Sequence, residues 1–164
     1  GRFCYAKNFD NIPEICSRLI QLGINVKWYI IGFGSDEDLI KQKIKQWNME
    51  RHVIILGKKE NPYPYIKECD LYVQPSRYEG KSVTVREAQI LAKPVVITNY
   101  KTADSQLQRN IDGIVVSLNN VECASEICLF LNNKKKYNDI ISNCQKRECS
   151  GKKEVEKLYR LLEG

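Results

Sequence analysis

Short apolar runs alternate with amphipathic segments along most of the chain, and this alternation constrains the fold more than any other feature. The apolar runs are rich in valine and isoleucine and cover residues 26–31, 53–56, 71–74, 95–98 and 114–116. The segments with helical spacing cover residues 12–22, 35–47 and 82–92, and a short helical turn is expected through Cys69. Strands of this kind are typical of a parallel sheet that is covered on both faces. The pattern therefore predicts an α/β fold, a Rossmann-like doubly wound parallel sheet.

The boundaries of the helical segments carry local signals. Pro13 lies near the start of the first helix and Gly23 just after its end, which are the positions that helix boundaries prefer. Ser35, with Asp38 three positions later, resembles a capping box and predicts that a helix opens there. Pro94 is expected to end the helix over residues 82–92.

The two ends of the chain are read from weaker patterns. Phe3 and Tyr5 alternate with polar or small residues, which predicts a short strand at the beginning. From residue 121 onward the spacing predicts helices with one break near residue 150. A parallel fold requires a strand before the opening residues, so Gly1 is expected to be the start of a fragment.

Size and composition predict one domain over residues 1–164, since 43% of its residues are hydrophobic and can fill one core. No apolar run approaches the roughly 18 residues that cross a bilayer. The formal charge of +6 indicates either a solvated basic surface or contact with a phosphate-bearing ligand or an anionic membrane. Nucleic acid is not an expected partner, because the basic residues are scattered and form no reader motif.

Cysteine and histidine usage argues against a metal site. The seven cysteines contain no Cys-x-x-Cys pair; they are Cys4, Cys16, Cys69, Cys123, Cys128, Cys144 and Cys149. Their odd number and apolar neighbours predict reduced thiols in a cytosolic protein. His52 is the single histidine and precedes an apolar run, so a place at a strand edge is expected rather than a catalytic role. Ligand spacing for a metal is missing.

Ligands of open parallel sheets bind outside the carboxyl ends of the strands, so the loops after the strands are the candidate site. The first of these loops contains Gly32 and Gly34. The two glycines allow either a close approach of backbone to a phosphate or a tight strand–helix turn. The dinucleotide fingerprint requires a third glycine where this chain has Glu37, so no NAD site is predicted.

The second loop covers residues 76–82 and leads into a helix whose free amides can bind an anion. Gly80 permits close approach to a ligand. Glu79 lies in the loop and Glu87 in the second helical turn, so both are expected to open onto one cleft. A carboxylate suits the vicinal hydroxyls of a ribose or a hexose. The alternative is that Glu79 caps the helix and Glu87 is a solvated surface charge.

The third candidate element is the pair of cations at the start of the chain. Arg2 and Lys7 are five positions apart and can flank a diphosphate, the first through its fork of donors and the second as a point charge. The alternative is a basic loop without a ligand.

Residues 76–100 resemble the donor-binding segment of retaining glycosyltransferases with the two-domain GT-B fold. The family pattern is Glu-Gly, a second Glu eight positions after the first, then Ala and a Pro-Val-Val strand. The matching residues are Glu79, Gly80, Glu87, Ala88, Pro94, Val95 and Val96. The opening residues 1–7 and the Asp-Gly-Ile-Val-Val stretch over residues 112–116 resemble further elements of the same family, in family order.

The resemblance implies a role for each matching residue. Arg2 and Lys7 would hold the diphosphate of the donor. Glu79 would be the catalytic residue at the transferred sugar, and Glu87 would bind the ribose. Backbone amides for the donor would come from Gly80, Lys81, Ser82 and Val83.

Two departures from the family pattern leave the identity of the transferred sugar undetermined. Ser82 stands where the family commonly has a second glycine, and Lys81 stands where it commonly has an aromatic residue. Both positions lie in the loop that the resemblance assigns to the donor, so the contacts to the sugar are expected to differ.

The resemblance implies transfer of a hexosyl group from a UDP-sugar or GDP-sugar to a hydroxyl acceptor, with retention, in bacterial surface polysaccharide or glycoconjugate synthesis. No metal or cofactor is implied, because the cations and helix amides would stabilise the departing diphosphate. The chain would be the donor-binding C-terminal half, inactive in isolation. Its own N-terminal domain would hold the acceptor site and, for a lipid-linked acceptor, contact the inner face of the membrane from the cytoplasm.

Three other functions fit parts of the sequence. A sugar-nucleotide epimerase of the same architecture would need acidic catalysts spread over both halves. A non-catalytic nucleotide-binding module is a further alternative, against which the presence of both Glu79 and Glu87 argues. A basic protein that binds polyanions is the last.

Overall fold

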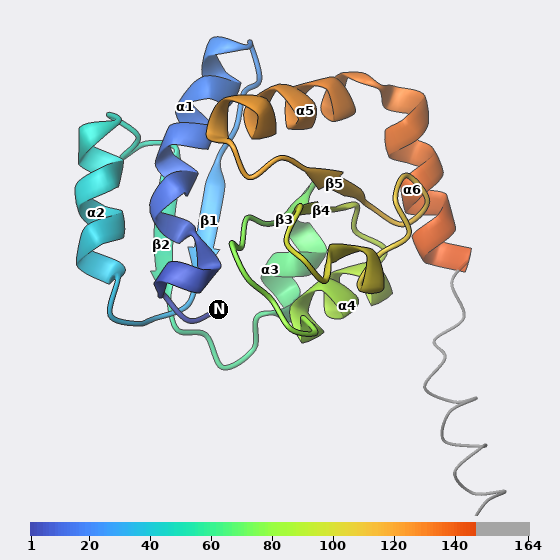
Figure 1. Cartoon of the computed structure of the whole chain (residues 1–164), viewed down its shortest axis with the longest axis horizontal. Coiled ribbons are helices and arrows are strands. Elements are labelled where there is room, and N and C mark those ends of the chain that lie inside the picture. Colours follow the sequence, from blue (N-terminus) through green and yellow to red (C-terminus); the bar gives the residue numbers. More distant parts are fainter. Residues whose placement is uncertain (147–164) are drawn as a thin grey trace, which may run out of the picture.

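Strands and helices alternate along the chain as the apolar pattern predicts (Figure 1). The computed structural model describes residues 1–146. The strands are β1 (Trp28–Ile31), β2 (Val53–Gly57), β3 (Tyr72–Gln74), β4 (Val95–Thr98) and β5 (Ile114–Val116). The α-helices are α1 (Ile12–Gln21), α2 (Glu37–Gln46), α3 (Tyr63–Glu68), α4 (Val83–Ile90), α5 (Asn120–Asn132) and α6 (Lys134–Lys146). The expected helix break near residue 150 and Cys149 lie outside the described residues.

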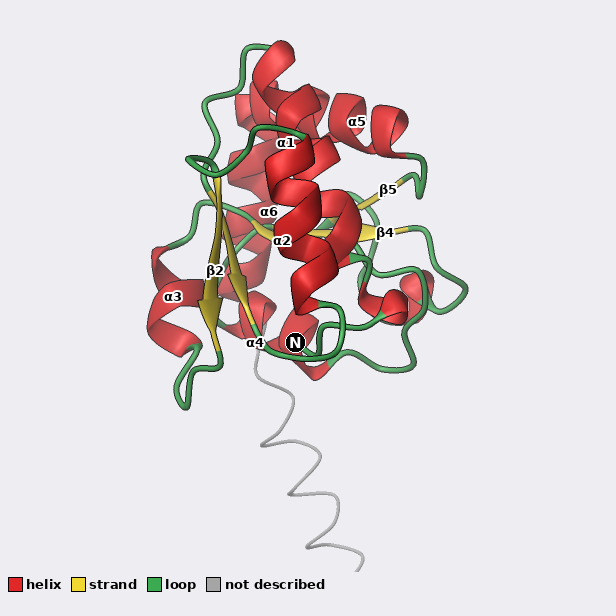
Figure 2. Cartoon of the chain, turned by 90° about the vertical axis from the view of Figure 1, so that its left-hand side faces the viewer, coloured by secondary structure: helices red, strands yellow, loops and turns green. Residues whose placement is uncertain are grey.

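All named strand pairs are parallel, which confirms the predicted fold class. The strands form two ladders: β1 pairs with β2, and β4 lies between β3 and β5. The predicted single sheet is therefore divided in the described residues, since no ladder joins β1 to β3. Figure 2 shows the two ladders running in clearly different directions. The two ladders share one hydrophobic cluster, because α1 and α5 pack against residues of both.

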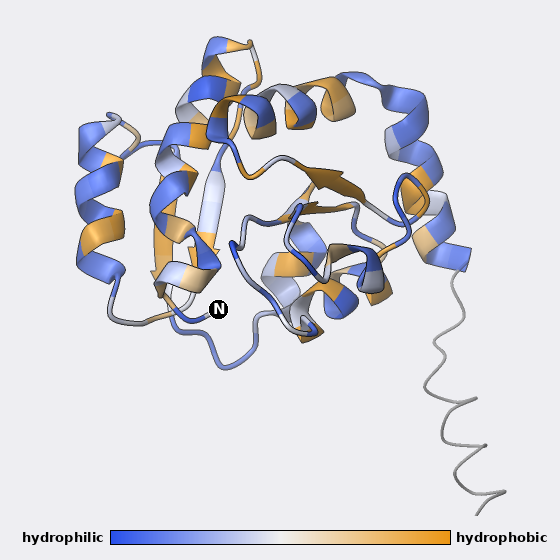
Figure 3. Ribbon diagram, viewed as in Figure 1, coloured by the Kyte–Doolittle hydropathy of each residue, from blue (hydrophilic) through white to orange (hydrophobic). Residues whose placement is uncertain are grey.

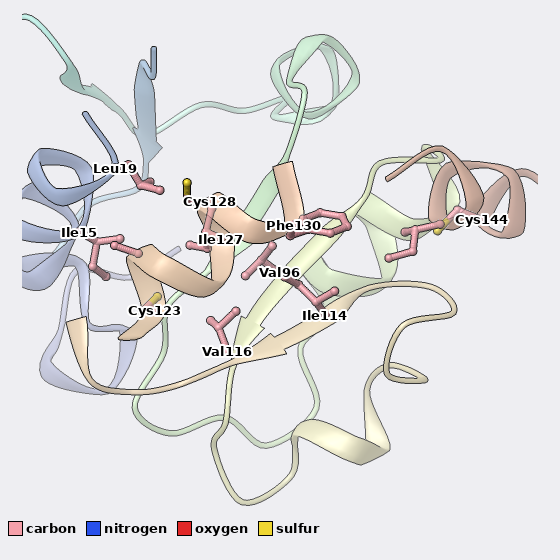
Figure 4. Packing of buried hydrophobic residues seen from close by; sticks show 12 residues of the cluster. Ile15, Leu19, Val96, Ile114, Val116, Cys123, Ile127, Cys128, Phe130 and Cys144 are labelled. Atoms are coloured by element: carbon pink, nitrogen blue, oxygen red, sulfur yellow. The ribbon is translucent and has the colours of Figure 1, made fainter. Parts of the chain in front are cut away.

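The largest hydrophobic cluster joins the two ladders. It places Ile15 and Leu19 of α1 against Ile127 of α5, and extends to Val96 and Val116 of the three-stranded ladder (Figure 4). All five side chains are 6% exposed or less. Residues three or four apart face one side of a helix, so α1 and α5 each bury one apolar stripe here. Figure 3 shows this division, with apolar strands inside and hydrophilic outer helix faces.

The opposite face of the three-stranded ladder is covered by α4. Val85 and Ala88 of this helix pack with Val95 and Ile97 of β4, and Tyr100 completes the cluster. In Figure 1, α5 lies on one side of β3, β4 and β5, while α3 and α4 lie on the other. The predicted arrangement of helices on both faces is thus confirmed for this ladder, and it explains why all four residues of β4 are buried.

The predicted capping box at the start of α2 is wrong. The helix begins at Glu37 after Asp36, and no side chain caps it. The Ser35 hydroxyl donates instead to the Asp36 carboxylate at 2.9 Å and lies 3.5 Å from the Phe3 carbonyl oxygen. A short side chain that bonds to its neighbour cannot also accept from the first helical turn.

The predicted strand over Phe3 and Tyr5 is also wrong. Phe3 is fully buried, but the chain turns directly afterwards into a 3-10 helix, Tyr5–Lys7. Pairing is limited to one bridge, between Arg2 and Phe33. The aromatic residues Phe3 and Tyr5 alternate in the sequence without forming a strand, because Phe3 is buried in the core and Tyr5 lies in the exposed turn that follows.

Candidate functional site

The loop between β3 and α4 gathers polar side chains around Glu79. One carboxylate oxygen, Oε1, accepts hydrogen bonds from Lys7 Nζ at 2.5 Å, Gln74 Nε2 at 2.7 Å and Ser76 Oγ at 2.7 Å. The Glu79 side chain is 8% exposed and that of Lys7 is 27% exposed. The loop and the start of the chain, 72 residues apart, thus meet in one half-buried ion pair. The structure brings together two of the predicted site residues, Lys7 and Glu79.

Gln74 is a site residue that the sequence patterns did not indicate. It is the last residue of β3 and is buried. Its amide nitrogen donates to Glu79 and to the Ser82 hydroxyl, while its amide oxygen accepts from Tyr72, Ser82 and Thr84 hydroxyls at 2.9–3.1 Å. Gln74 is a polar amide that ends an otherwise apolar run, and this position was the signal that could have identified it.

A second set of hydrogen bonds fixes the backbone of the loop. Thr102 Oγ1 donates to the Glu79 carbonyl at 2.6 Å, and Gln106 Nε2 donates to the Gly80 carbonyl at 2.9 Å. The Ser82 amide donates to Gln106 Oε1 at 3.1 Å. The segment after β4 therefore holds the loop in place from outside.

The start of α4 offers some of the expected amides. Ser82 caps the helix, with its hydroxyl accepting from the Val85 amide at 3.4 Å. Because the Ser82 amide is engaged with Gln106, it is not free for an anion in this structure. The amides of Gly80, Lys81 and Val83 donate to no group within residues 1–146. Ser82, and not Glu79, therefore caps the start of α4.

Glu87 lies on α4 and is half-buried rather than a free surface charge. Its Oε1 accepts from the Tyr63 hydroxyl at 3.0 Å, and this contact raises the pKa of Tyr63. Burial raises the pKa of Tyr72 to about 12, with further contributions from the nearby charges of Glu79 and Glu87. The Tyr72 phenol thus lies within electrostatic reach of both carboxylates.

Arg2 and the glycines after β1 lie beside one another. Arg2 is exposed, and its side chain makes no hydrogen bond or ion pair within the described residues. A Cβ atom on Gly34 would come within 2.3 Å of the Phe3 carbonyl oxygen, and one on Gly32 within 1.9 Å of that of Gly1. The glycines therefore allow the first residues to pass close to the turn. Of the two interpretations of this loop, the structure supports the tight strand–helix turn.

Neither Glu79 nor Glu87 lines either of two hollows found among the described residues. One hollow, of about 270 Å³, is lined by Tyr5, Asn8, Asn11, Arg77, Tyr78 and Leu118. The other, of about 340 Å³, is lined by Gln108, Ile111, Asp112, Asn143 and Lys146. The opening of Glu79 and Glu87 onto one cleft therefore stays a prediction.

His52 lies away from this site, as expected for a strand-edge residue. It directly precedes β2, and its Nδ1 is 2.9 Å from the Val26 carbonyl oxygen. The six cysteines within residues 1–146 are unpaired. Within the same residues, no helix has the length and apolar character needed to span a membrane.

Comparison with known sequences relates the whole described region to one family. Residues 1–147 match the sequence profile of the family described as Glycosyl transferases group 1. The chain is 30% identical over 135 residues to the poly(ribitol-phosphate) alpha-N-acetylglucosaminyltransferase of Staphylococcus aureus, covering 81% of this chain and 27% of the relative. It is 31% identical over 121 residues to the N-acetylgalactosamine-N,N'-diacetylbacillosaminyl-diphospho-undecaprenol 4-alpha-N-acetylgalactosaminyltransferase of Campylobacter jejuni, covering 73% of this chain and 32% of the relative. The chain thus spans about a third of these relatives or less.

Solved structures show the same architecture. The crystal structure of TarM superposes with a TM-score of 0.83 at 26% identity, over 100% of this chain and 34% of that chain. A mutant of S. aureus TarM in complex with fondaparinux, alpha-GlcNAc-glycerol and UDP gives a TM-score of 0.79 at 28% identity, over 88% of this chain and 30% of that chain. The C-terminal domain of LpcC from Francisella tularensis gives 0.75 at 20% identity, covering 88% of this chain and 78% of that domain, which shows the fold alone.

Proposed function

The chain belongs to the glycosyl transferases group 1 family, and from this premise we propose that it is the donor-binding part of a hexosyltransferase. The donor is a UDP-sugar or GDP-sugar, and the acceptor is a hydroxyl group. The observation that carries the proposal is the half-buried pair of Lys7 and Glu79 beside the start of α4. It places a cation, a carboxylate and free backbone amides together at the carboxyl end of β3, where parallel sheets bind ligands.

Lys7 and Arg2 bind the diphosphate in this proposal. An ammonium group has three donors, and Lys7 uses one of them on Glu79, so two remain for phosphate oxygens. Arg2 is exposed without a partner in residues 1–146 and can offer its fork to the same diphosphate. The amides of Gly80, Lys81 and Val83 add neutral donors at a helix start. The Ser82 amide joins them only if it leaves Gln106.

Glu79 acts on the transferred sugar, and Glu87 binds the ribose. Glu79 accepts three hydrogen bonds on Oε1, whereas its Oε2 has no partner within the described residues and can accept from a sugar hydroxyl. Glu87 accepts one hydrogen bond from Tyr63 and has further acceptor capacity for vicinal hydroxyls. The two carboxylates are thereby directed to different parts of one donor.

The reaction breaks the bond between the anomeric carbon and the diphosphate oxygen and forms one to the acceptor oxygen, with retention. Negative charge builds on the departing diphosphate, which takes up the proton that the acceptor hydroxyl loses. Lys7, Arg2 and the helix amides stabilise that charge; one such preorganised donor contributes about 3–4 kcal/mol. No metal or cofactor has a role in this scheme.

The whole protein is proposed to act in bacterial surface polysaccharide or glycoconjugate synthesis. Relatives in this family include an amylovoran biosynthesis glycosyltransferase, AmsD, which is 28% identical over 116 residues. Because the chain spans about a third or less of the S. aureus and C. jejuni transferases, we place the acceptor site in an N-terminal domain of the full-length protein. That domain would also bring the protein to the inner face of the membrane from the cytoplasm.

Thermal unfolding with candidate ligands tests the proposed function. UDP or GDP should raise the melting temperature, because a ligand that binds the folded state stabilises it. NAD and a single-stranded oligonucleotide serve as controls and should leave it unchanged. Stabilisation by the oligonucleotide alone would favour a polyanion-binding protein and refute donor binding.

A further inference from the structure

The hollow of about 270 Å³ is lined by none of the residues assigned to the donor. Its lining comes from the turn over residues 5–11, from Arg77 and Tyr78 after β3, and from Leu118 after β5. Tyr78 directly precedes Glu79 in the loop. A molecule in this hollow would therefore contact the residue that directly precedes, in the loop, the glutamate that the proposed function directs to the transferred sugar.

Arg77 makes the framework of the hollow rigid. Its guanidinium forms a fork with the Asp10 carboxylate at 3.0 and 2.8 Å, donates to the Tyr5 carbonyl at 2.7 Å and lies 4.3 Å from the centre of the Tyr5 ring. The amides of Arg77 and Tyr78 both donate to the Ala6 carbonyl oxygen at 2.8 and 3.2 Å. The two loops are thus tied to each other by backbone and side-chain bonds.

Two tyrosine rings remain exposed on this rigid framework. Tyr5 is 64% exposed and Tyr78 is 65% exposed, and their ring centres lie 6.4 Å apart at an angle of 39°. Neither ring contributes to a hydrophobic cluster of the core. Tyrosine offers a large, stiff contact area at a small cost in side-chain entropy, and aromatic side chains are common in ligand pockets.

The charge of the lining selects the kind of ligand. Arg77 is the single charged residue of the lining, and Asp10 neutralises it. Asn8 Nδ2 donates to the Pro75 carbonyl oxygen and Asn8 Oδ1 accepts from Asn11 Nδ2, whereas Asn11 Oδ1 accepts no hydrogen bond within residues 1–146. A neutral surface of aromatic rings with one open amide oxygen suits a neutral ligand that has apolar faces and hydroxyl donors. A pyranose ring is neutral and has both, whereas a phosphate is charged and has no apolar face.

Resting on the proposed function, we propose that Tyr5, Tyr78 and Asn11 bind a neutral pyranose unit of the acceptor. The sugar packs on the tyrosine rings and donates a hydroxyl hydrogen bond to Asn11 Oδ1. The donor-binding part of the enzyme thereby contributes directly to holding the acceptor beside Glu79.

Titration with the methyl glycosides of glucose, galactose and N-acetylglucosamine, followed by NMR, tests this inference. At least one of them should bind saturably to the wild-type chain. Tyr78→Ala should weaken that binding about fivefold or more, as expected for the loss of an aromatic contact. Tyr78→Phe keeps the ring and should retain the affinity, as should Tyr65→Ala, which removes an exposed ring of α3 outside the hollow.

A parallel titration with UDP and GDP separates this inference from the proposed function. Nucleotide binding without binding of any glycoside, or glycoside binding that is equal in wild type and Tyr78→Ala, overturns the acceptor site and leaves the donor role standing. Glycoside binding that depends on Tyr78 without any nucleotide binding upholds the carbohydrate site and refutes the donor role.

Discussion

The single oxygen Oε1 of Glu79 is where the candidate site is most strongly organised. Lys7, Gln74 and Ser76 all donate to it, although they come from the start of the chain, the end of β3 and the following loop. A carboxylate that is only 8% exposed is costly to bury unless it is paired and hydrogen-bonded, and here it is both. The orientation of Glu79 is therefore set before a ligand arrives.

Glu87→Ala should weaken binding of UDP and GDP while leaving the fold intact. The ribose would lose a charged acceptor, a loss of roughly 1.5–3 kcal/mol, or about 10- to 100-fold in affinity. Calorimetry measures the change, and Glu68→Ala, which removes an exposed carboxylate of α3, is the matched control. Equal nucleotide affinities in wild type and Glu87→Ala would refute the assigned role.

Gln74→Met should lower the free energy of unfolding by about 1–3 kcal/mol. The variant keeps a side chain of similar length but leaves the buried hydroxyl network of Tyr72, Ser82 and Thr84 without its central partner. Urea unfolding measures the loss. Gln46→Met, at an exposed position of α2, should change stability by no more than about 0.5 kcal/mol, and a similar result for both variants would show that the network has no stabilising role.

At the scale of elements, the site depends on two loops that other segments hold in place. The loop before α4 is fixed by Thr102 and Gln106, and the first residues pass against the turn between β1 and α2. Gly34 makes that passage possible, because any side chain there would meet the backbone of Phe3. The position of Lys7 thus follows in part from a packing requirement at Gly34 and Phe3.

Gly34→Ala should destabilise the protein by about 1–3 kcal/mol, since its Cβ would lie 2.3 Å from the Phe3 carbonyl oxygen. Gly80→Ala is the control, because a Cβ at Gly80 meets nothing within 4 Å. Thermal and urea unfolding should show no more than about 0.5 kcal/mol of change for the control. If the two variants unfold alike, the close approach at Gly34 is not what holds the first residues.

The sequence predicted the elements better than their ends. Periodic apolar residues identified the five strands and the helices α1, α2 and α4, because burial enforces the pattern. Helical structure after residue 121 was predicted too, but the break that separates α5 from α6 at Asn133 was not. The capping box at Ser35 failed because the hydroxyl has a nearer partner in Asp36. The sequence did not predict the role of Gln74, because its hydrogen-bond partners come together only in the fold. The division of the strands into two ladders was not predicted either, because it depends on which strands pair in three dimensions.

At the scale of the whole molecule, buried thiols link stability to pH. Burial raises the pKa of Cys16 to about 11 and that of Cys123 to about 12, from an ordinary value of 9.0. Both thiols stay protonated in the folded state at pH values where those of the unfolded chain ionise. Their contribution to stability is therefore complete below about pH 9 and is lost as pH rises toward 11 and 12.

The melting temperature should accordingly fall as the pH is raised from about 8 to about 10. A variant with Cys16→Ala and Cys123→Ala should show a shallower fall over this range, since it lacks the two buried thiols. Calorimetric scans of both proteins under reducing conditions measure the slopes. Equal slopes would show that ionisation of other groups governs the alkaline transition.

The central claim is that this chain binds the nucleoside diphosphate of a sugar donor through contacts within its own residues. Isothermal titration calorimetry with UDP and GDP tests it most directly, alongside an assay for transfer to simple acceptors. The wild-type chain should bind one of the two with a Kd of about 0.1–1 mM, or roughly 4–5.5 kcal/mol, and should transfer no sugar. Arg2→Ala should weaken that binding while Lys27→Ala, at another exposed cation, leaves it unchanged. A folded wild-type chain that binds neither nucleotide would contradict the claim, and efficient transfer by this chain alone would show that the acceptor chemistry does not require another domain.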